Sequence, residues 1–224
     1  VFSIELKDYD ELTGTVIFAN PNAPTGVYLS QQAICDFLER HPNRLVVVDE
    51  AYIDFGCTSL ISKITQYENL FVVGTFSKSR QLAGARLGFG VGNKKVIADL
   101  NRLRFSLNPY NINALTQAVG SAVLQEQAYV NQTIQKTIDV REWSKQQLAA
   151  LGFEQTDSQG NFLFVKHSQI SAEALFQALR AKKILVRWFN QPRAKEYLRI
   201  TVGTQEQMRA LIKAVKKILT EVTS

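Results

Sequence analysis

The sequence predicts an α/β fold with a mostly parallel sheet and helices on both faces, followed by a small C-terminal α+β domain. Short apolar segments alternate with helical or loop segments over residues 1–90, a pattern typical of parallel strands joined by crossover helices. The run Val46-Val47-Val48 lacks polar alternation, as expected for a strand buried on both faces. From residue 161 onward, short strand and helix patterns follow one another closely.

Local patterns predict the individual elements. Ser30 suits the N-cap of a helix over residues 31–39. Residues 111–151 are rich in Ala, Gln and Leu, with neither Gly nor Pro between Ser121 and Leu151, which predicts one or two long helices. The predicted strands of the first part span residues 15–19, 44–48, 70–74 and 87–91, and the tail is predicted to contain strands over 161–166, 184–187 and 197–202 and helices over 172–181 and 205–219.

Length and pattern together suggest how the chain is divided. The 224 residues are enough for one large domain or two modest ones. We expect a first domain over residues 1–115, a linking helix over 116–140 and the small α+β domain over 141–224. The first residue, Val1, is not Met. This indicates a fragment or a processed product.

Composition and charge exclude several classes of function. The net charge is +6, but the basic residues are spread along the chain, so we expect no nucleic-acid partner. No apolar run reaches membrane-spanning length and no signal-peptide pattern is present, so we expect a cytoplasmic protein without a membrane partner. Cys35 and Cys57 have no C-x-x-C spacing and no neighbouring His cluster, so neither a metal site nor a disulfide is expected.

Polar residues follow three successive predicted strands. Asn20-Pro21-Asn22 begins the first such segment, Asp49-Glu50-Ala51-Tyr52 is the second, and Thr75 to Lys78 is the third. Ligands bind beyond the carboxyl ends of parallel strands, so these segments are expected to meet in one pocket. Taken one at a time, each also has a simpler interpretation, as a turn or as solvated strand-end charges.

Lys78 carries the most specific chemistry in the chain. A lysine at the end of a buried strand can act as an amine nucleophile if its pKa is lowered. The hydroxyls of Thr75 and Ser77 and the guanidinium of Arg86 would suit a phosphate group. An amine beside a phosphate cradle is what a pyridoxal phosphate (PLP) site needs. The alternative is a solvated lysine in a Ser-rich turn.

The ordered motifs resemble those of one family. These motifs are NPNAPTG, DEAYIDFG, TFSKS, AGARLGFG, Asn108-Pro109-Tyr110-Asn111, Leu185-Val186-Arg187 and LRITVGT. With them the chain resembles the fold-type I PLP-dependent aminotransferases and, within them, the histidinol-phosphate aminotransferases. The resemblance runs from Val16 to Thr204 and implies that residues 1–115 form the C-terminal portion of a large PLP-binding domain.

The resemblance implies a role for each matched cofactor residue. Lys78 matches the lysine that binds PLP as a Schiff base and later acts as general base. Asp49 matches the carboxylate that pairs with the pyridine nitrogen, and Tyr52 matches the residue that hydrogen-bonds the ring 3-oxygen. Thr75, Ser77 and Arg86 match phosphate ligands.

The resemblance also implies substrates and a partner. Arg199 matches the arginine that binds the substrate carboxylate, and Arg187 matches one that helps to bind a substrate phosphate. The implied reaction moves an amino group between glutamate (with 2-oxoglutarate as its keto partner) and imidazole-acetol phosphate, giving histidinol phosphate. The family's site uses residues from both subunits, which implies a homodimer.

Two departures from the family pattern leave alternatives open. Ala23 stands where the family commonly has Asn, so either Asn22 substitutes or Tyr52 carries the contact to the 3-oxygen alone. No glycine-rich helix start precedes Val16, although the family's N-terminal region normally supplies one. The alternatives are a threonine-phosphate-type decarboxylase, an aromatic aminotransferase, or a non-catalytic fragment of such an enzyme.

Overall fold

The computed structural model describes residues 2–223, with side chains up to residue 221, and contains two four-stranded sheets. In the first sheet the order is β1-β2-β3-β4; β1, β2 and β3 are parallel and β4 is antiparallel to β3. The second sheet has the order β5-β6-β8-β7, and all its pairs are antiparallel. The predicted α/β fold class, with a mostly parallel sheet, is confirmed.

The strands are β1 (Val16–Ala19), β2 (Val46–Asp49), β3 (Leu70–Thr75), β4 (Gly88–Gly92), β5 (Phe153–Gln155), β6 (Phe162–His167), β7 (Arg187–Trp188) and β8 (Leu198–Thr201).

Helix α1 (Gln31–Arg40) covers one face of the first sheet. The Ser30 side chain caps it by accepting a hydrogen bond from the backbone N–H of Ala33, as predicted. Phe37 and Leu38 of α1 are buried in one cluster with Val48 of β2. On the face opposite α1, Ile17 of β1 is 69% exposed. No part of the described chain therefore covers β1 on that face.

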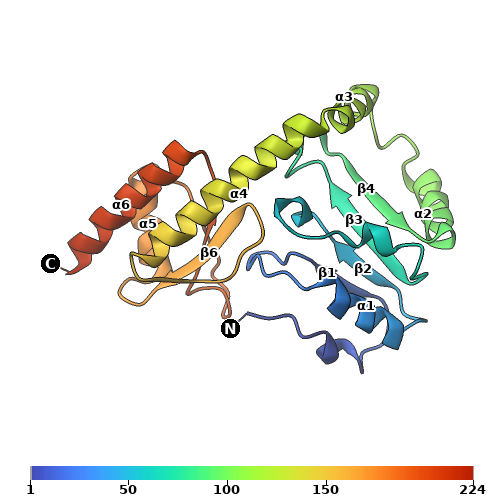
Figure 1. Cartoon of the computed structure of the whole chain (residues 1–224), viewed down its shortest axis with the longest axis horizontal. Coiled ribbons are helices and arrows are strands. Elements are labelled where there is room, and N and C mark those ends of the chain that lie inside the picture. The colour runs from blue at the N-terminus through green and yellow to red at the C-terminus, as the bar shows by residue number, and fades with distance from the viewer. Residues whose placement is uncertain (1, 224) are drawn as a thin grey trace.

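Three helices link the two sheets. The prediction of one or two long helices over residues 111–151 is confirmed by α3 (Ala114–Gln125) and α4 (Gln127–Ala149). Figure 1 shows α4 running from the first sheet to the second as one long helix. Helix α2 (Lys94–Leu107) was not predicted, and none of its residues is buried.

The C-terminal unit packs two helices on the second sheet. Helices α5 (Ala172–Ala181) and α6 (Gln205–Thr223) were predicted, with α6 extending beyond the expected end. Leu179 of α5, Val215 of α6 and Leu198 of β8 are at most 1% exposed and share one core. Strand β5 was not predicted. The strand expected over residues 184–187 is present only from Arg187, as β7.

The loop after β1 fastens the two units together. The Thr156 hydroxyl donates to the Thr25 carbonyl at 2.5 Å, and the Gln159 N–H donates to the Gly26 carbonyl at 2.8 Å. The backbone of Gly26 lies against Ser158, so closely that an added Cβ would come within 2.0 Å of the Ser158 Oγ. The domain boundaries at residues 115 and 140 remain predictions. In the part of the chain that the structure describes, no helix is both long and apolar enough to cross a membrane.

Candidate active site

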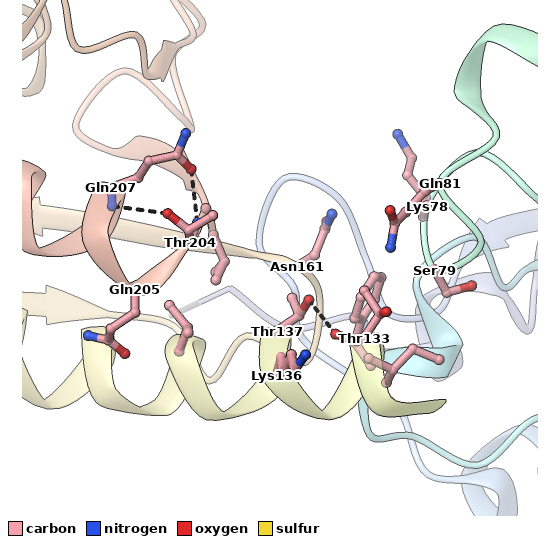
Figure 2. A pocket seen from close by; sticks show the side chains of 15 residues that line it. Lys78, Ser79, Gln81, Thr133, Lys136, Thr137, Asn161, Thr204, Gln205 and Gln207 are labelled. Carbon is pink, nitrogen blue, oxygen red and sulfur yellow. Dashed lines mark hydrogen bonds between the residues drawn. The ribbon is translucent and has the colours of Figure 1, made fainter. Parts of the chain in front are cut away.

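Lys78 lies in the loop after β3, between the two units. This lysine loop (residues 76–82) borders a cavity of about 580 Å³, together with α4 and the start of α6. Figure 2 shows Lys78 and Gln81 on one side of the cavity, Thr133 on α4 and Thr204 on the side of α6. Among the described residues, the Lys78 amine makes no hydrogen bond or ion pair. Its Nζ lies 5.3 Å from the centre of the Tyr52 ring.

Tyr52 and Arg199 meet across the junction between the units. They are 147 residues apart in sequence, yet the Arg199 Nη2 donates to the Tyr52 hydroxyl at 3.1 Å. The Arg199 guanidinium carbon lies 4.1 Å from the centre of the Phe162 ring, and that ring contacts Tyr52 edge to face at 5.1 Å. Stacking on an aromatic ring orients a guanidinium and leaves its other N–H donors free for an anion.

Asp49 and Thr75 share the sheet face opposite α1. The parallel register pairs Asp49 with Val73, and side chains two residues apart on a strand point the same way, so Thr75 lies on the Asp49 face. The Asp49 Oδ1 accepts a hydrogen bond from the Ala51 N–H at 2.9 Å. The next residue, Glu50, is 3% exposed, and alternation along the strand turns its side chain toward the other face.

Hydroxyl groups and an arginine surround the turn that follows β3. The Thr75 Oγ1 accepts from the Ser77 N–H at 3.1 Å and donates to the Leu87 carbonyl at 3.4 Å. The pairing of Thr75 with Gly88 places Arg86 close to the base of this hairpin. Arg86 is exposed, has a φ of 55°, and donates to the Ala83 carbonyl at 3.0 Å.

Arg187 and Asn22 differ in how they relate to the other predicted site residues. Arg187 on β7 pairs directly with Arg199 on β8, so the two side chains share one face of the second sheet. The Asn22 Oδ1 accepts from the Thr25 hydroxyl at 2.9 Å. Asn22 lines a cavity that Lys78 does not line. The structure joins Lys78, Tyr52 and Arg199 through direct contacts, and among the described residues Asn22 makes no hydrogen bond to any of these three.

Several neighbours of the site were not predicted. Phe162 was expected only as part of a strand, and no local signal marks it as the ring beneath Arg199. Asp54 lies inside the DEAYIDFG motif, and its oxygen binds two side chains of the lysine loop, those of Ser79 and Arg80. The motif could have drawn attention to this third carboxylate, two residues after Tyr52.

Two further groups near the site are constrained by burial. Burial raises the pKa of the Glu50 carboxyl above its ordinary value. Hydrogen bonds from the Leu60 N–H and the Ser59 hydroxyl lower this pKa, but their effect is smaller. Burial also raises the pKa of the Cys57 thiol to about 11, so this thiol is protonated at neutral pH and is a poor nucleophile. Within the described residues, no group of His, Cys, Asp and Glu side chains could hold a metal ion.

Comparison with known proteins identifies relatives of the chain. A family model of aminotransferase class I and II matches residues 3–215. Histidinol-phosphate aminotransferase of Lactococcus lactis subsp. lactis is 44% identical over 97% of this chain and 61% of its own length. The enzyme of the same name from Clostridium botulinum (strain Langeland) is 42% identical over 97% of this chain and 62% of its own length.

The fold is also found in solved structures. The crystal structure of histidinol-phosphate aminotransferase from Sinorhizobium meliloti in complex with pyridoxal-5'-phosphate matches with a TM-score of 0.86 and 23% identity, over 97% of this chain and 60% of that one. The chain thus spans about three fifths of the length of the relatives it matches. With most of its residues matched by the family model, this chain belongs to the class I and II aminotransferase family.

Proposed function

We propose that the protein is a PLP-dependent aminotransferase that moves an amino group between glutamate and imidazole-acetol phosphate, forming histidinol phosphate. The names of relatives 42% and 44% identical to the chain support this substrate pair. The observation that carries the proposal is the meeting of Lys78, Tyr52 and Arg199, because an amine, a phenol and a guanidinium from distant segments converge there.

The donor set suits PLP. The Lys78 amine is not engaged by any described residue, Asp49 lies at a strand end on the sheet face that α1 leaves open, and Thr75 and Ser77 supply hydroxyl groups beside it. Asp49 would hold the pyridine nitrogen, Tyr52 the ring 3-oxygen, and Thr75, Ser77 and Arg86 the phosphate. When bound, PLP supplies an electron sink for the pair left on the substrate when its α carbon loses a proton.

The protein's own residues would then perform three tasks. The Lys78 amine would take the proton from the substrate α carbon, hold it at Nζ and deliver it to the carbon on the other side of the substrate nitrogen, a 1,3-proton shift. The Tyr52 hydroxyl accepts a hydrogen bond from Arg199, which orients both groups. Burial of Tyr52, which is 8% exposed, limits access of water to this edge of the site.

The paired arginines suit two anionic substrates, one that presents a carboxylate and one that presents a phosphate ester. Arg199 would bind a carboxylate through charge-assisted hydrogen bonds. Arg187, on the same face of the neighbouring strand, would bind the phosphate of the second substrate. A carboxylate of glutamate would thus contact Arg199, and the single phosphate group of histidinol phosphate would contact Arg187.

We also propose that the protein works as a homodimer. Helices α2 and α3 expose apolar side chains, among them Leu103 at 58%, Leu107 at 83% and Leu115 at 80%. Large apolar side chains exposed on two consecutive helices favour an interface with another protein chain. Light scattering of the purified protein should give twice the monomer mass, and a monomer mass at micromolar concentration would contradict the dimer.

The central experiment measures cofactor binding and amino transfer. The protein incubated with PLP should show the visible absorbance of the lysine-bound cofactor, and Lys78→Ala should abolish it. Lys136→Ala is the matched control, because Lys136 lines the same cavity from α4 and has no proposed role. If the unmodified protein shows no such absorbance, the enzyme proposal is wrong and the non-catalytic alternative gains support.

A second measurement separates the enzyme alternatives. Glutamate-dependent conversion of imidazole-acetol phosphate should be observed without release of CO₂. Release of CO₂ from a phosphorylated amino acid would instead identify a decarboxylase, and preference for an aromatic amino acid would identify an aromatic aminotransferase.

A further inference from the structure

Asp54 joins the lysine loop to the turn that carries Tyr52. This Tyr52 turn (residues 50–56) includes the short 3-10 helix η2 (Ile53–Phe55). The Asp54 Oδ2 accepts a hydrogen bond from the Ser79 hydroxyl and a second from the Arg80 Nη1 at 2.8 Å. Ser79 is 3% exposed, so its O–H group is shielded from water and has the carboxylate as its acceptor, while its oxygen accepts from the Arg80 Nη1 at 3.3 Å.

The arginine of the Asp54–Arg80 ion pair packs over a buried aromatic ring. The Arg80 guanidinium carbon lies 5.5 Å from the centre of the Phe76 ring, and Phe76 is 6% exposed. The Arg80 side chain itself is 16% exposed. Partial burial of this kind strengthens an ion pair relative to one in open solvent. The Asp54–Arg80 pair is therefore held more firmly than a surface pair such as Asp99–Arg102, whose side chains are 69% and 82% exposed.

The Lys78 amine contacts the Tyr52 ring, but the hydrogen bonds that hold its loop come from the residues that follow it. No described residue hydrogen-bonds its amine, whereas the next two residues along the chain both bind Asp54. Tyr52 lies two residues before Asp54. The carboxylate therefore sets the distance between the segment that carries the amine and the segment that carries the phenol.

We propose that Asp54 is a positioning residue for Lys78, one that holds the lysine loop against the Tyr52 turn so that the amine meets the cofactor in one orientation. The inference deepens the proposed function and rests on it for its catalytic meaning. The contacts of Asp54 with Ser79 and Arg80 involve only the protein chain, so their effect on the lysine loop can be measured without the cofactor.

The first test measures local opening of the lysine loop. In Asp54→Ala, amide hydrogen exchange in residues 76–82 should accelerate roughly tenfold, as expected when a charge-assisted hydrogen bond is lost. Asp99→Ala removes the carboxylate of a similar Asp–Arg pair far from the loop and should leave this exchange unchanged. Unchanged exchange in α5 would show that the fold of Asp54→Ala is intact. Equal exchange in both variants overturns the proposal, whether or not PLP binds.

The second test uses the cofactor's absorbance. The pH at which the lysine-bound visible band changes form should move to lower pH in Asp54→Ala, because the Arg80 guanidinium, two residues from Lys78, would lose its counter-charge and disfavour the protonated form. Asp99→Ala should keep the unmodified midpoint. A band present in the unmodified protein with the same midpoint in Asp54→Ala contradicts positioning by Asp54. Absence of the band in the unmodified protein contradicts the proposed function instead. The exchange experiment alone then decides whether Asp54 holds the lysine loop against the Tyr52 turn.

Discussion

Replacing Arg141 with alanine removes a buried guanidinium that joins three segments of the chain. Arg141 lies on α4 and is 3% exposed. Its Nη1 donates to the Phe55 carbonyl at 2.9 Å and to the Gly160 carbonyl at 3.0 Å. The first carbonyl ends the Tyr52 turn, and the second precedes Phe162. The substitution therefore leaves acceptors without donors on both sides of the candidate site.

The magnitude follows from those two carbonyls. An unsatisfied buried acceptor costs about 1–3 kcal/mol, so two of them cost roughly 2–6 kcal/mol. Water that enters the space left by the side chain recovers part of this. Loss of one member of a buried charged network typically costs about 3–5 kcal/mol. We expect Arg141→Ala to lower the free energy of unfolding by about 3–5 kcal/mol, a large part of the about 5–15 kcal/mol typical of a whole protein.

Urea unfolding, followed by the fluorescence of the two tryptophans, measures this change. Glu142→Gln is the control: the Glu142 carboxylate binds the Arg141 Nε at 2.7 Å but is 47% exposed, so its loss should cost only about 0–1 kcal/mol. The reasoning is refuted if Arg141→Ala costs less than about 1 kcal/mol, or no more than Glu142→Gln, since buried acceptors would then be satisfied without the guanidinium.

Three other substitutions test other parts of the structure. Gly26→Ala should lower the midpoint of thermal unfolding, because Gly26 has a φ of 75° and a Cβ there would collide with Ser158. The raised pKa of buried Glu50 means that its contribution to stability is full below its ordinary pKa of 4.5 and is lost as pH rises through the folded-state pKa. In urea-unfolding measurements, Glu50→Gln should therefore remove the part of the decrease in unfolding free energy with rising pH that comes from Glu50. In steady-state kinetics, Arg187→Gln should raise the KM for histidinol phosphate roughly tenfold or more and leave the KM for glutamate nearly unchanged, because a charge-assisted contact to phosphate is lost.

Each of these expectations has a clear contrary result. Unaltered thermal stability of Gly26→Ala would mean that the loop and the second unit separate readily. Parallel pH profiles for the unmodified protein and Glu50→Gln would mean that Glu50 ionises normally. An equal rise of both KM values in Arg187→Gln would place Arg187 outside the phosphate subsite, and Lys195→Gln, on an exposed residue beyond β7, is the control for general charge effects.

Local signals account for most of the fold and for little of the site's geometry. Helix α5 was predicted with both of its ends, residues 172 and 181, and the structure shows Ser171 capping its start. Helix α2 was missed although Asn93 caps it. Strand β5 has only three residues, too few for a periodic signal. The contact between Tyr52 and Arg199 joins segments 147 residues apart, and no local pattern encodes such a distance; only the resemblance to a family suggested that they share a site.

The pairing of Arg187 with Arg199 has a consequence for how the protein responds to ions. Like charges directly opposite each other on adjacent strands destabilise the pairing, and β7 has only two residues to hold it in place. An anion bound between the guanidinium groups would cancel that repulsion and secure the edge of the second sheet. Inorganic phosphate should therefore protect the β7 amides from exchange. Sodium chloride should weaken this protection, as the Debye length shrinks to about 8 Å at physiological ionic strength.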